Sequence, residues 1–318
     1  MTATITNVIA RVLPIILIIA IGSLIRSRRV LSESTVDELR GLVVKVALPA
    51  VLFMAFLEME LDSSYIGLFL VIAAVCFLML GLGYLLRRVL KVEHEYYPFL
   101  ITGFEFGMVG ITLFGTAYGL ANAGYIAIVD LSHELFIWFV LATLLTAKRD
   151  GASSLASILK GFATSPLIIA ILLALALNLA GLGSSFREIA FGAAIAQTLE
   201  FLGGLLIPLI LILIGYGMRL SWSAIRESIG IVVLRLAILI PLAILINVFV
   251  VRRWLALDPA FEAAIFTFFI LPPPFIVPLF IKSEQADERT YVNNVLSVYT
   301  TVSLVIFIGY FVLNPTLG

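Results

Sequence analysis

Three ionisable residues lie close together within one apolar stretch of the chain. Asp130, His133 and Glu134 occupy positions i, i+3 and i+4, a spacing that places all three on one face of a helix. Two carboxylates and an imidazole on one buried face could share a proton and titrate as a unit near neutral pH. The pattern predicts proton or ion coupling. The alternative is a polar stripe that packs against another helix or lines a thin file of water molecules.

A further carboxyl group, Glu105, lies about two turns into another apolar stretch, directly before the glycine-containing run at residues 107–110. We expect Glu105 to carry a proton or to bind a cation. The alternative is a neutral, hydrogen-bonded carboxylic acid that props open the local structure. Glu105 and the three residues above are the candidates for proton or ion coupling.

The composition indicates that these groups lie in a membrane. The 318 residues are 62% hydrophobic and only 13% charged, with a mean hydropathy of +1.16. A soluble domain of this size needs a larger charged shell. An ionisable group near the bilayer centre costs roughly 2.5–3.5 kcal/mol on insertion scales, so each one needs a reason. The formal net charge is zero and gives no indication of nucleic-acid binding, so we expect a lipid bilayer as the partner.

Apolar stretches of about 20 residues can cross a bilayer as helices. The sequence contains ten, which predicts an all-α polytopic protein with ten transmembrane helices. They lie at about 7–25, 36–57, 64–86, 97–118, 123–147, 161–181, 189–216, 228–251, 261–281 and 290–312.

Lys and Arg residues predict the orientation of these helices. Of the 20 in the chain, most lie in the loops after the odd-numbered spans. The loops rich in Lys and Arg face the cytoplasm, so we expect both termini outside the cell (inner) membrane. Arg11, Lys45 and Arg235 fall inside spans, and we expect them to snorkel to an interface or to form ion pairs.

The strongest pattern is an internal repeat. Residues 87–122 and 252–287 align at a constant offset, with a double arginine, an apolar run and an interruption of that run in each copy. The interruptions are residues 107–110 and 272–274. Apolar segments interrupted at corresponding positions point to the binding site of a secondary transporter. We therefore predict inverted five-helix repeats at 1–147 and 161–318, a cytoplasmic linker at 148–160, and broken, crossing helices four and nine.

These features resemble the auxin efflux carrier family, in its compact prokaryotic form. The resemblance rests on LPAVLF at residues 48–53, the two interruptions and VYTTVS at residues 298–303. Glu105 and Thr112 stand where the family usually has Asn and Pro. The resemblance implies a bile-acid-symporter-like fold, a scaffold of helices 1, 2, 6 and 7, and a transport domain of helices 3–5 and 8–10. It also implies a homodimer.

The interruptions and the resemblance together suggest a substrate site. Half-helix N-termini carry partial positive charge that suits an anion. Glu200 is one expected substrate contact, and its alternative role is a structural hydrogen bond. For the hydroxyl groups of helix ten, the alternative role is a hydrogen bond to their own backbone. The expected substrate-binding residues are Gly107, Met108, Val109, Gly110, Thr112, Pro272, Pro273, Pro274, Glu200, Tyr299 and Thr300.

The function expected from these features is secondary active efflux of a small organic anion, either auxin-like or another carboxylate, by alternating access. Protons and sodium are both open as coupling ions. One alternative is a cation–proton antiporter on the same fold, and another is a membrane sensor that binds a ligand without moving it. We expect no enzymatic activity because no catalytic motif is present. We expect no cofactor and no metal, since the cluster has no second histidine nearby.

Overall fold

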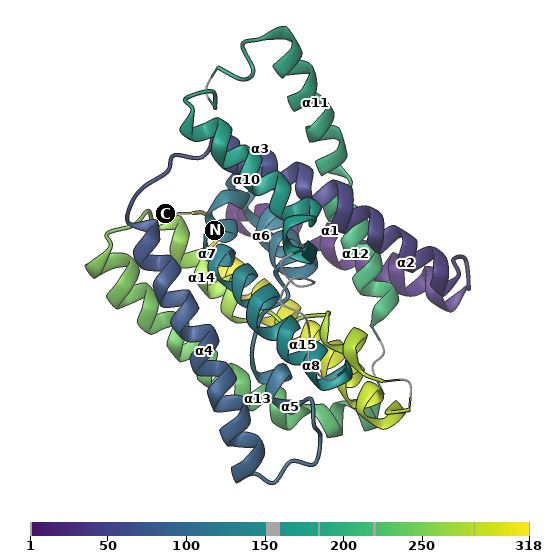
Figure 1. Ribbon diagram of the computed structural model, residues 1–318. Helices are drawn as coiled ribbons and strands as arrows, with labels where there is room; N and C mark the ends of the chain where they lie inside the picture. The colour runs from purple at the N-terminus through teal and green to yellow at the C-terminus, as the bar shows by residue number, and fades with distance from the viewer. Residues whose placement is uncertain (1, 151–159, 184, 219–220, 283, 318) are drawn as a thin grey trace.

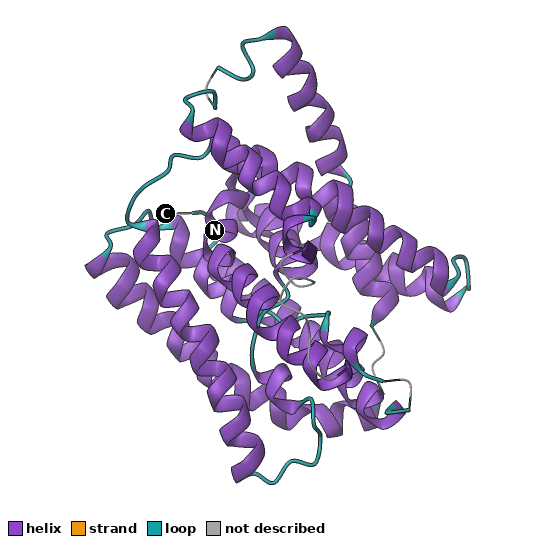
Figure 2. Cartoon of the chain, viewed as in Figure 1, coloured by secondary structure: helices purple, strands orange, loops and turns teal. Residues whose placement is uncertain are grey.

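The computed structural model describes residues 2–150, 160–183, 185–218, 221–282 and 284–317. These residues form helices and loops without a strand (Figure 2). The predicted all-α class is therefore confirmed for these residues. Within the described ranges, seven helical segments are long and apolar enough to cross a membrane: Glu33–Glu58, Tyr65–Val89, Tyr97–Tyr118, Leu120–Arg149, Ala190–Gly217, Trp222–Trp254 and Ala286–Leu313. Shorter apolar helices at Leu13–Ser27, Pro166–Leu179 and Ala260–Phe269 fall in three further predicted spans.

Several of these segments contain more than one element. The first part of the chain contains α1 (Thr2–Ser27), α2 (Glu33–Leu42), η1 (Val43–Ala47), α3 (Leu48–Glu58), α4 (Tyr65–Val89), α5 (Tyr97–Ile101), η2 (Phe106–Gly110), α6 (Ile111–Tyr118), η3 (Leu120–Asn122), α7 (Ala123–Phe136), η4 (Ile137–Leu141) and α8 (Ala142–Asp150). The second contains α10 (Pro166–Leu179), α11 (Ala190–Gly204), α12 (Leu206–Gly217), α13 (Trp222–Leu245), η5 (Ile246–Trp254), α14 (Ala260–Phe269), η6 (Val277–Phe280) and α15 (Ala286–Leu313).

Side-chain caps decide where helices α2 and α13 begin. The Ser32 hydroxyl accepts the Thr35 N–H at the start of α2, and the Ser221 hydroxyl accepts the Ala224 N–H at the start of α13. Each hydroxyl satisfies a backbone donor that has no partner within the helix. The cap at Ser221 starts α13 well before residue 228, where the sequence predicted the span. Because the helix starts earlier, each residue of α13 lies further from the N-terminal end of the helix than the sequence predicted.

The helices separate into two groups (Figure 1). One contains α1, α2, α3, α10, α11 and α12, and the other contains α4, α5, α7, α8, α13, α14 and α15. Within the first group α1 packs along α12 and α3 along α10. Within the second, α4 packs on α7 and α13 on α15. Helix α11 stands at the edge and exposes Phe191 and Phe201. Apolar side chains exposed in this way suit contact with lipid.

Only one of the two predicted helix breaks lies where the sequence placed it. Residues 272–274 are not helical, so the interruption predicted at the three prolines is confirmed. The interruption predicted at 107–110 is wrong, because these residues belong to the π-helical turn η2. The chain is instead non-helical at 102–105, directly before that turn. Gly103 takes a left-handed conformation with φ 68°, which ends α5.

Candidate functional site at the crossing of two helix breaks

The two helix breaks meet although 170 residues separate them in sequence. The backbone N–H of Glu105 donates to the carbonyl of Pro272 at 2.8 Å. A Cβ atom built on Gly103 would lie 2.6 Å from Cγ of Pro274, so the missing side chain allows this approach. We call residues 102–105 and 272–275 the crossing. Ser303 of α15 also donates its hydroxyl to the Ile270 carbonyl at 2.6 Å, which ties α15 to the second break.

The carboxylate of Glu105 joins the two sides of the crossing. Its Oε2 accepts the Phe275 N–H at 2.6 Å, and its Oε1 accepts the Met108 N–H at 3.3 Å. Glu105 thus caps η2 and lies at the end of the break, whereas the sequence predicted it within a helix before the break. Backbone N–H groups at membrane depth need a partner within the protein. Glu105 supplies one to each side.

The other residues of the first break also have defined partners. The Phe104 N–H donates to Nε2 of His133 at 2.9 Å. The Gly103 carbonyl accepts a hydrogen bond from Nη2 of Arg235. The Thr102 hydroxyl donates to the Cys76 carbonyl at 3.2 Å. Side chains or backbone from α4, α7 and α13 therefore hold this short non-helical segment.

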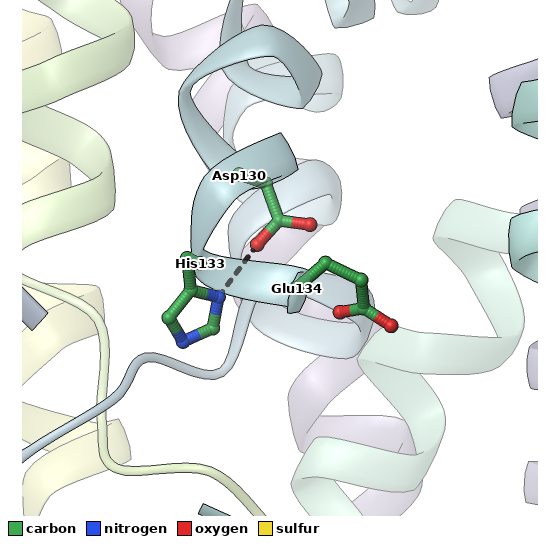
Figure 3. Close-up of side chains that lie close together, drawn as sticks. All are labelled: Asp130, His133 and Glu134. Atoms are coloured by element: carbon green, nitrogen blue, oxygen red, sulfur yellow. Dashed lines mark hydrogen bonds and ion pairs between the residues drawn. The ribbon is translucent and has the colours of Figure 1, made fainter. Parts of the chain in front are cut away.

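The predicted cluster on α7 contains one tight pair. His133 Nδ1 lies 2.8 Å from Oδ1 of Asp130, and both side chains are buried (Figure 3). Because Nε2 of His133 accepts the Phe104 N–H, it carries no proton. The proton of the neutral imidazole is therefore on Nδ1 and points to Asp130. Glu134 accepts the Trp138 indole N–H at 2.8 Å instead, and its side chain extends away from the imidazole in Figure 3.

Asp130, His133 and Glu134 are residue types that commonly bind metal ions. Their candidate ligand atoms all lie within 4.8 Å of one another. Both ring nitrogens of His133 are nevertheless engaged, one by Asp130 and the other by the Phe104 amide. An imidazole with a backbone N–H directed at Nε2 has no nitrogen free for an ion. The arrangement is suited to holding and moving a proton.

Arg235 is the largest difference from the sequence-based expectations. It was expected to snorkel or to pair with a carboxylate, but its side chain is completely buried, at 0% exposure. Its guanidinium carbon lies 5.1 Å from the ring centre of Phe104 and 4.9 Å from that of Tyr299. Because α13 begins at Trp222, Arg235 is about 20 Å along the helix, too far from the end to snorkel. Lys45 is exposed, and the Arg11 side chain lies outside the described residues.

The profile of a protein family decides the class of this chain. The membrane transport protein profile, which describes transporters of the auxin efflux carrier type, matches residues 7–311. The chain belongs to this membrane transport protein family. The resemblance to the auxin efflux carriers is thereby confirmed, and the protein is a membrane transporter. Comparison with individually curated proteins gives no match.

This transporter has a cavity that reaches the crossing. Its volume is about 520 Å³, and its lining includes Met108, Phe275 and Thr300. The hydroxyl of Thr300 donates to the Leu296 carbonyl at 2.7 Å, which is the backbone bond considered as the alternative for this residue. Met108 and Phe275 are also the residues whose N–H groups bind Glu105. The cavity therefore reaches the two residues whose N–H groups bind Glu105, although the Glu105 side chain does not line it.

A second cavity of about 690 Å³ contains the predicted residue Glu200, away from the crossing. Arg187 lies between two carboxylates here, at 2.7 Å from Glu200 and 2.6 Å from Glu58. Glu200 also accepts a hydrogen bond from Gln197. The remaining predicted substrate residues line neither cavity: Gly107, Val109, Gly110, Thr112, Pro272, Pro273, Pro274 and Tyr299.

The sequence predicted no role for Gly103 or Phe104, and it predicted a different role for Arg235. Two signals were present. Gly103 stands two residues before a carboxyl group in an apolar stretch, and a glycine there permits the left-handed conformation that ends the helix. Arg235 is the one basic residue within its predicted span, and a charge in that position calls for a partner. No pattern in the sequence indicates that this partner is the Gly103 carbonyl.

Proposed function

We propose that this transporter is a secondary active carrier that exports a small organic anion, such as an auxin-like compound or another carboxylate, by alternating access. The observation that carries the proposal is the cavity of about 520 Å³ that ends at the crossing. Its volume suits a small organic molecule. Irregular backbone at membrane depth is tolerated only beside a cavity or packed protein, and here it lies beside both.

The proposed architecture is two inverted five-helix repeats, at 1–147 and 161–318, that form a scaffold and a moving transport domain. The helix pairs support this proposal. The contact of α1 with α12 and that of α3 with α10 each join the two repeats, and the α4–α7 contact has its counterpart in α13–α15. The two groups in Figure 1 also match the division into helices 1, 2, 6 and 7 against the others.

The proposed orientation places both termini on the non-cytoplasmic side of the cell (inner) membrane. The cavity at the crossing is lined at its other end by Glu33, Asp37 and Arg40, which belong to the region rich in basic residues. In this orientation the cavity opens to the cytoplasm, as an exporter requires for loading. Most of the predicted linker at 148–160 lies outside the described residues. A homodimer through helices two and seven rests on the family resemblance alone, and the mass of the protein in native-like lipid would test it.

One observation favours a second function. The Glu105 carboxylate already accepts the two N–H groups, of Met108 and Phe275, that an anionic substrate could use. A cation–proton antiporter would instead use Glu105, Asp130 and Glu134 as its ion site. In an anion carrier, Glu105 has to release these N–H groups, or the substrate has to bind elsewhere in the cavity.

Transport into proteoliposomes separates these functions. A panel of radiolabelled organic acids is tested with and without a pH gradient, and with sodium or choline as the cation. We expect saturable transport of at least one organic acid. Thr300→Trp, which fills the cavity, should reduce it at least about tenfold, since a side chain that occupies the site excludes substrate. Trp at the exposed position Ile66 serves as the control. Sodium–proton exchange without organic-acid transport would replace the proposal by the antiporter.

A further inference from the structure

One peptide group in the first break is held from both sides by buried ionisable side chains. It is the peptide between Gly103 and Phe104. Its carbonyl accepts from Arg235 on α13, and its N–H donates to Nε2 of His133 on α7. His133 and Arg235 are 2% and 0% exposed. We call this arrangement the peptide clamp.

The two side chains of the clamp, Arg235 and His133, respond differently to protonation. The guanidinium of Arg235 has donors only and stays charged, so it can hold a carbonyl in every state. His133 can accept the Phe104 N–H only while Nε2 is unprotonated. A proton added to Nε2 places two N–H donors against each other. The hydrogen bond at 2.9 Å then becomes repulsive and has to open.

Burial of the imidazole and the charge of Arg235 oppose an added proton on His133, and the neighbouring carboxylates favour it. Asp130 already accepts the proton on Nδ1 at 2.8 Å, so it would stabilise an imidazolium. Glu134 on the same helix adds negative charge, and Arg235 on α13 opposes it. Glu105 lies near Asp130, and Cys76 on α4 lies near both Asp130 and Arg235. From α14 the His133 ring meets Phe268 and from the break Phe104, which are both uncharged. From α15, Tyr299 stacks on Arg235.

The backbone at Gly103 permits the released peptide to rotate. Gly103 has no Cβ and already takes φ 68°, so rotation about this residue meets less steric resistance than at other residue types. Glu105 follows one residue later and carries the bonds to Pro272 and Phe275. Any rotation of the 103–104 peptide therefore acts directly on the contact between the two breaks.

We propose that His133 is the residue that couples protons to movement of the crossing, and that Arg235 is the positioning residue that keeps the clamp aligned. A proton from the acidic side binds to Nε2, the Phe104 hydrogen bond opens, and the crossing rearranges. Loss of the same proton to the other side restores the bond. The inference rests on the proposed function for the transport that it drives, and it names the coupling ion as a proton.

The first test is His133→Gln. The glutamine carbonyl oxygen can accept the Phe104 N–H and cannot be protonated at neutral or mildly acidic pH. Transport by the wild type should change several-fold between pH 5.5 and pH 8. The variant should melt within a few degrees of the wild type, transport the substrate and show no such change. His94→Gln, at the only other histidine, is the control and should keep the wild-type pH dependence. If His133→Gln keeps that dependence as well, the proposal is overturned.

The second test needs no transported substrate, so it distinguishes failure of the clamp from failure of the proposed function. The purified protein in lipid nanodiscs is labelled with ¹⁵N in histidine side chains and in the backbone amide of Phe104. At pH 8, His133 should show a proton on Nδ1 and none on Nε2. Acidification should protonate Nε2 and shift the Phe104 amide with the same midpoint. Arg235→Lys, which keeps a donor for the Gly103 carbonyl, should preserve this shared midpoint. A proton on Nε2 at pH 8, or a Phe104 amide that does not follow His133, would overturn the proposal.

Discussion

The carboxylate of Glu105 lies 2.6 Å from the backbone nitrogen of Phe275, 170 residues further along the chain. This bond, with that from Met108 to the same carboxylate, joins the two helix breaks through one side chain. Breaks in transmembrane helices leave backbone donors without partners, and here one acidic residue satisfies a donor on each side. Glu105 therefore has a structural role at the crossing whichever substrate the transporter moves.

Replacing Glu105 by alanine should destabilise the protein. The change leaves two N–H groups without their acceptor, and hydrogen bonds of this kind contribute about 1–3 kcal/mol when one buried partner is removed. Thermal unfolding in detergent should show a lower melting temperature. Glu38→Ala, at an exposed position on α2, is the control and should have little effect. An unchanged melting temperature for Glu105→Ala would mean that water replaces the carboxylate without loss.

Gly103→Ala should destabilise the crossing by a different mechanism. The residue has φ 68°, and an added Cβ would lie 2.6 Å from Cγ of Pro274. Left-handed strain and the clash together should cost about 1–3 kcal/mol. Gly81→Ala is the matched control, because nothing lies within 4 Å of its Cβ position on α4 and alanine favours the helix. A melting temperature of Gly103→Ala equal to that of Gly81→Ala would argue against close packing at the crossing.

Cysteine labelling tests the proposed orientation. The chain has a single cysteine, Cys76, which is buried, so the wild type should not react with a membrane-impermeant maleimide. Ser63→Cys, in the loop before α4, should react in intact cells. Ser34→Cys, in the region rich in basic residues, should react only after the membrane is opened, as should a cysteine at position 153 of the linker. The reverse pattern would invert the orientation, and the cavity at the crossing would then open outward.

The ion pair between Lys148 and Glu95 connects α8 to the loop before α5 at 2.6 Å. The hydrogen bond from Lys148 and its charge lower the pKa of Glu95. A carboxyl group with a lowered pKa stabilises the fold above its ordinary pKa, and this contribution is lost as the pH falls through the lowered value. Glu95→Gln should therefore reduce stability at pH 7 by about 0.2–1 kcal/mol, because the pair is partly exposed. In chemical unfolding this difference should shrink below about pH 4. A difference that grows on acidification would assign the effect to another group.

Much of the fold could be predicted because long apolar segments depend on local composition. The spans, the membrane location and the interruption at the three prolines need only hydropathy and the missing N–H of proline. The position of the first break could not be predicted in the same way. Gly107 and Gly110 are glycines, which often interrupt helices, but both remain helical here. Gly103 instead takes the left-handed conformation. Packing against Pro274 distinguishes them, and that contact comes from the other half of the chain.

The sequence by itself determined that this protein is built from apolar membrane helices with ionisable groups inside them, because composition and spacing along one helix are local properties, and its match to the family profile gave the transporter class. The i, i+3 spacing alone brings Asp130 to His133. Only the tertiary structure decided which backbone groups these side chains bind. Arg235 and His133 lie on different helices, and they meet the same peptide because α7 and α13 pack on either side of a break that starts at residue 102. A hydrogen bond between residues more than 100 positions apart depends on the packing of whole helices, which no local pattern encodes.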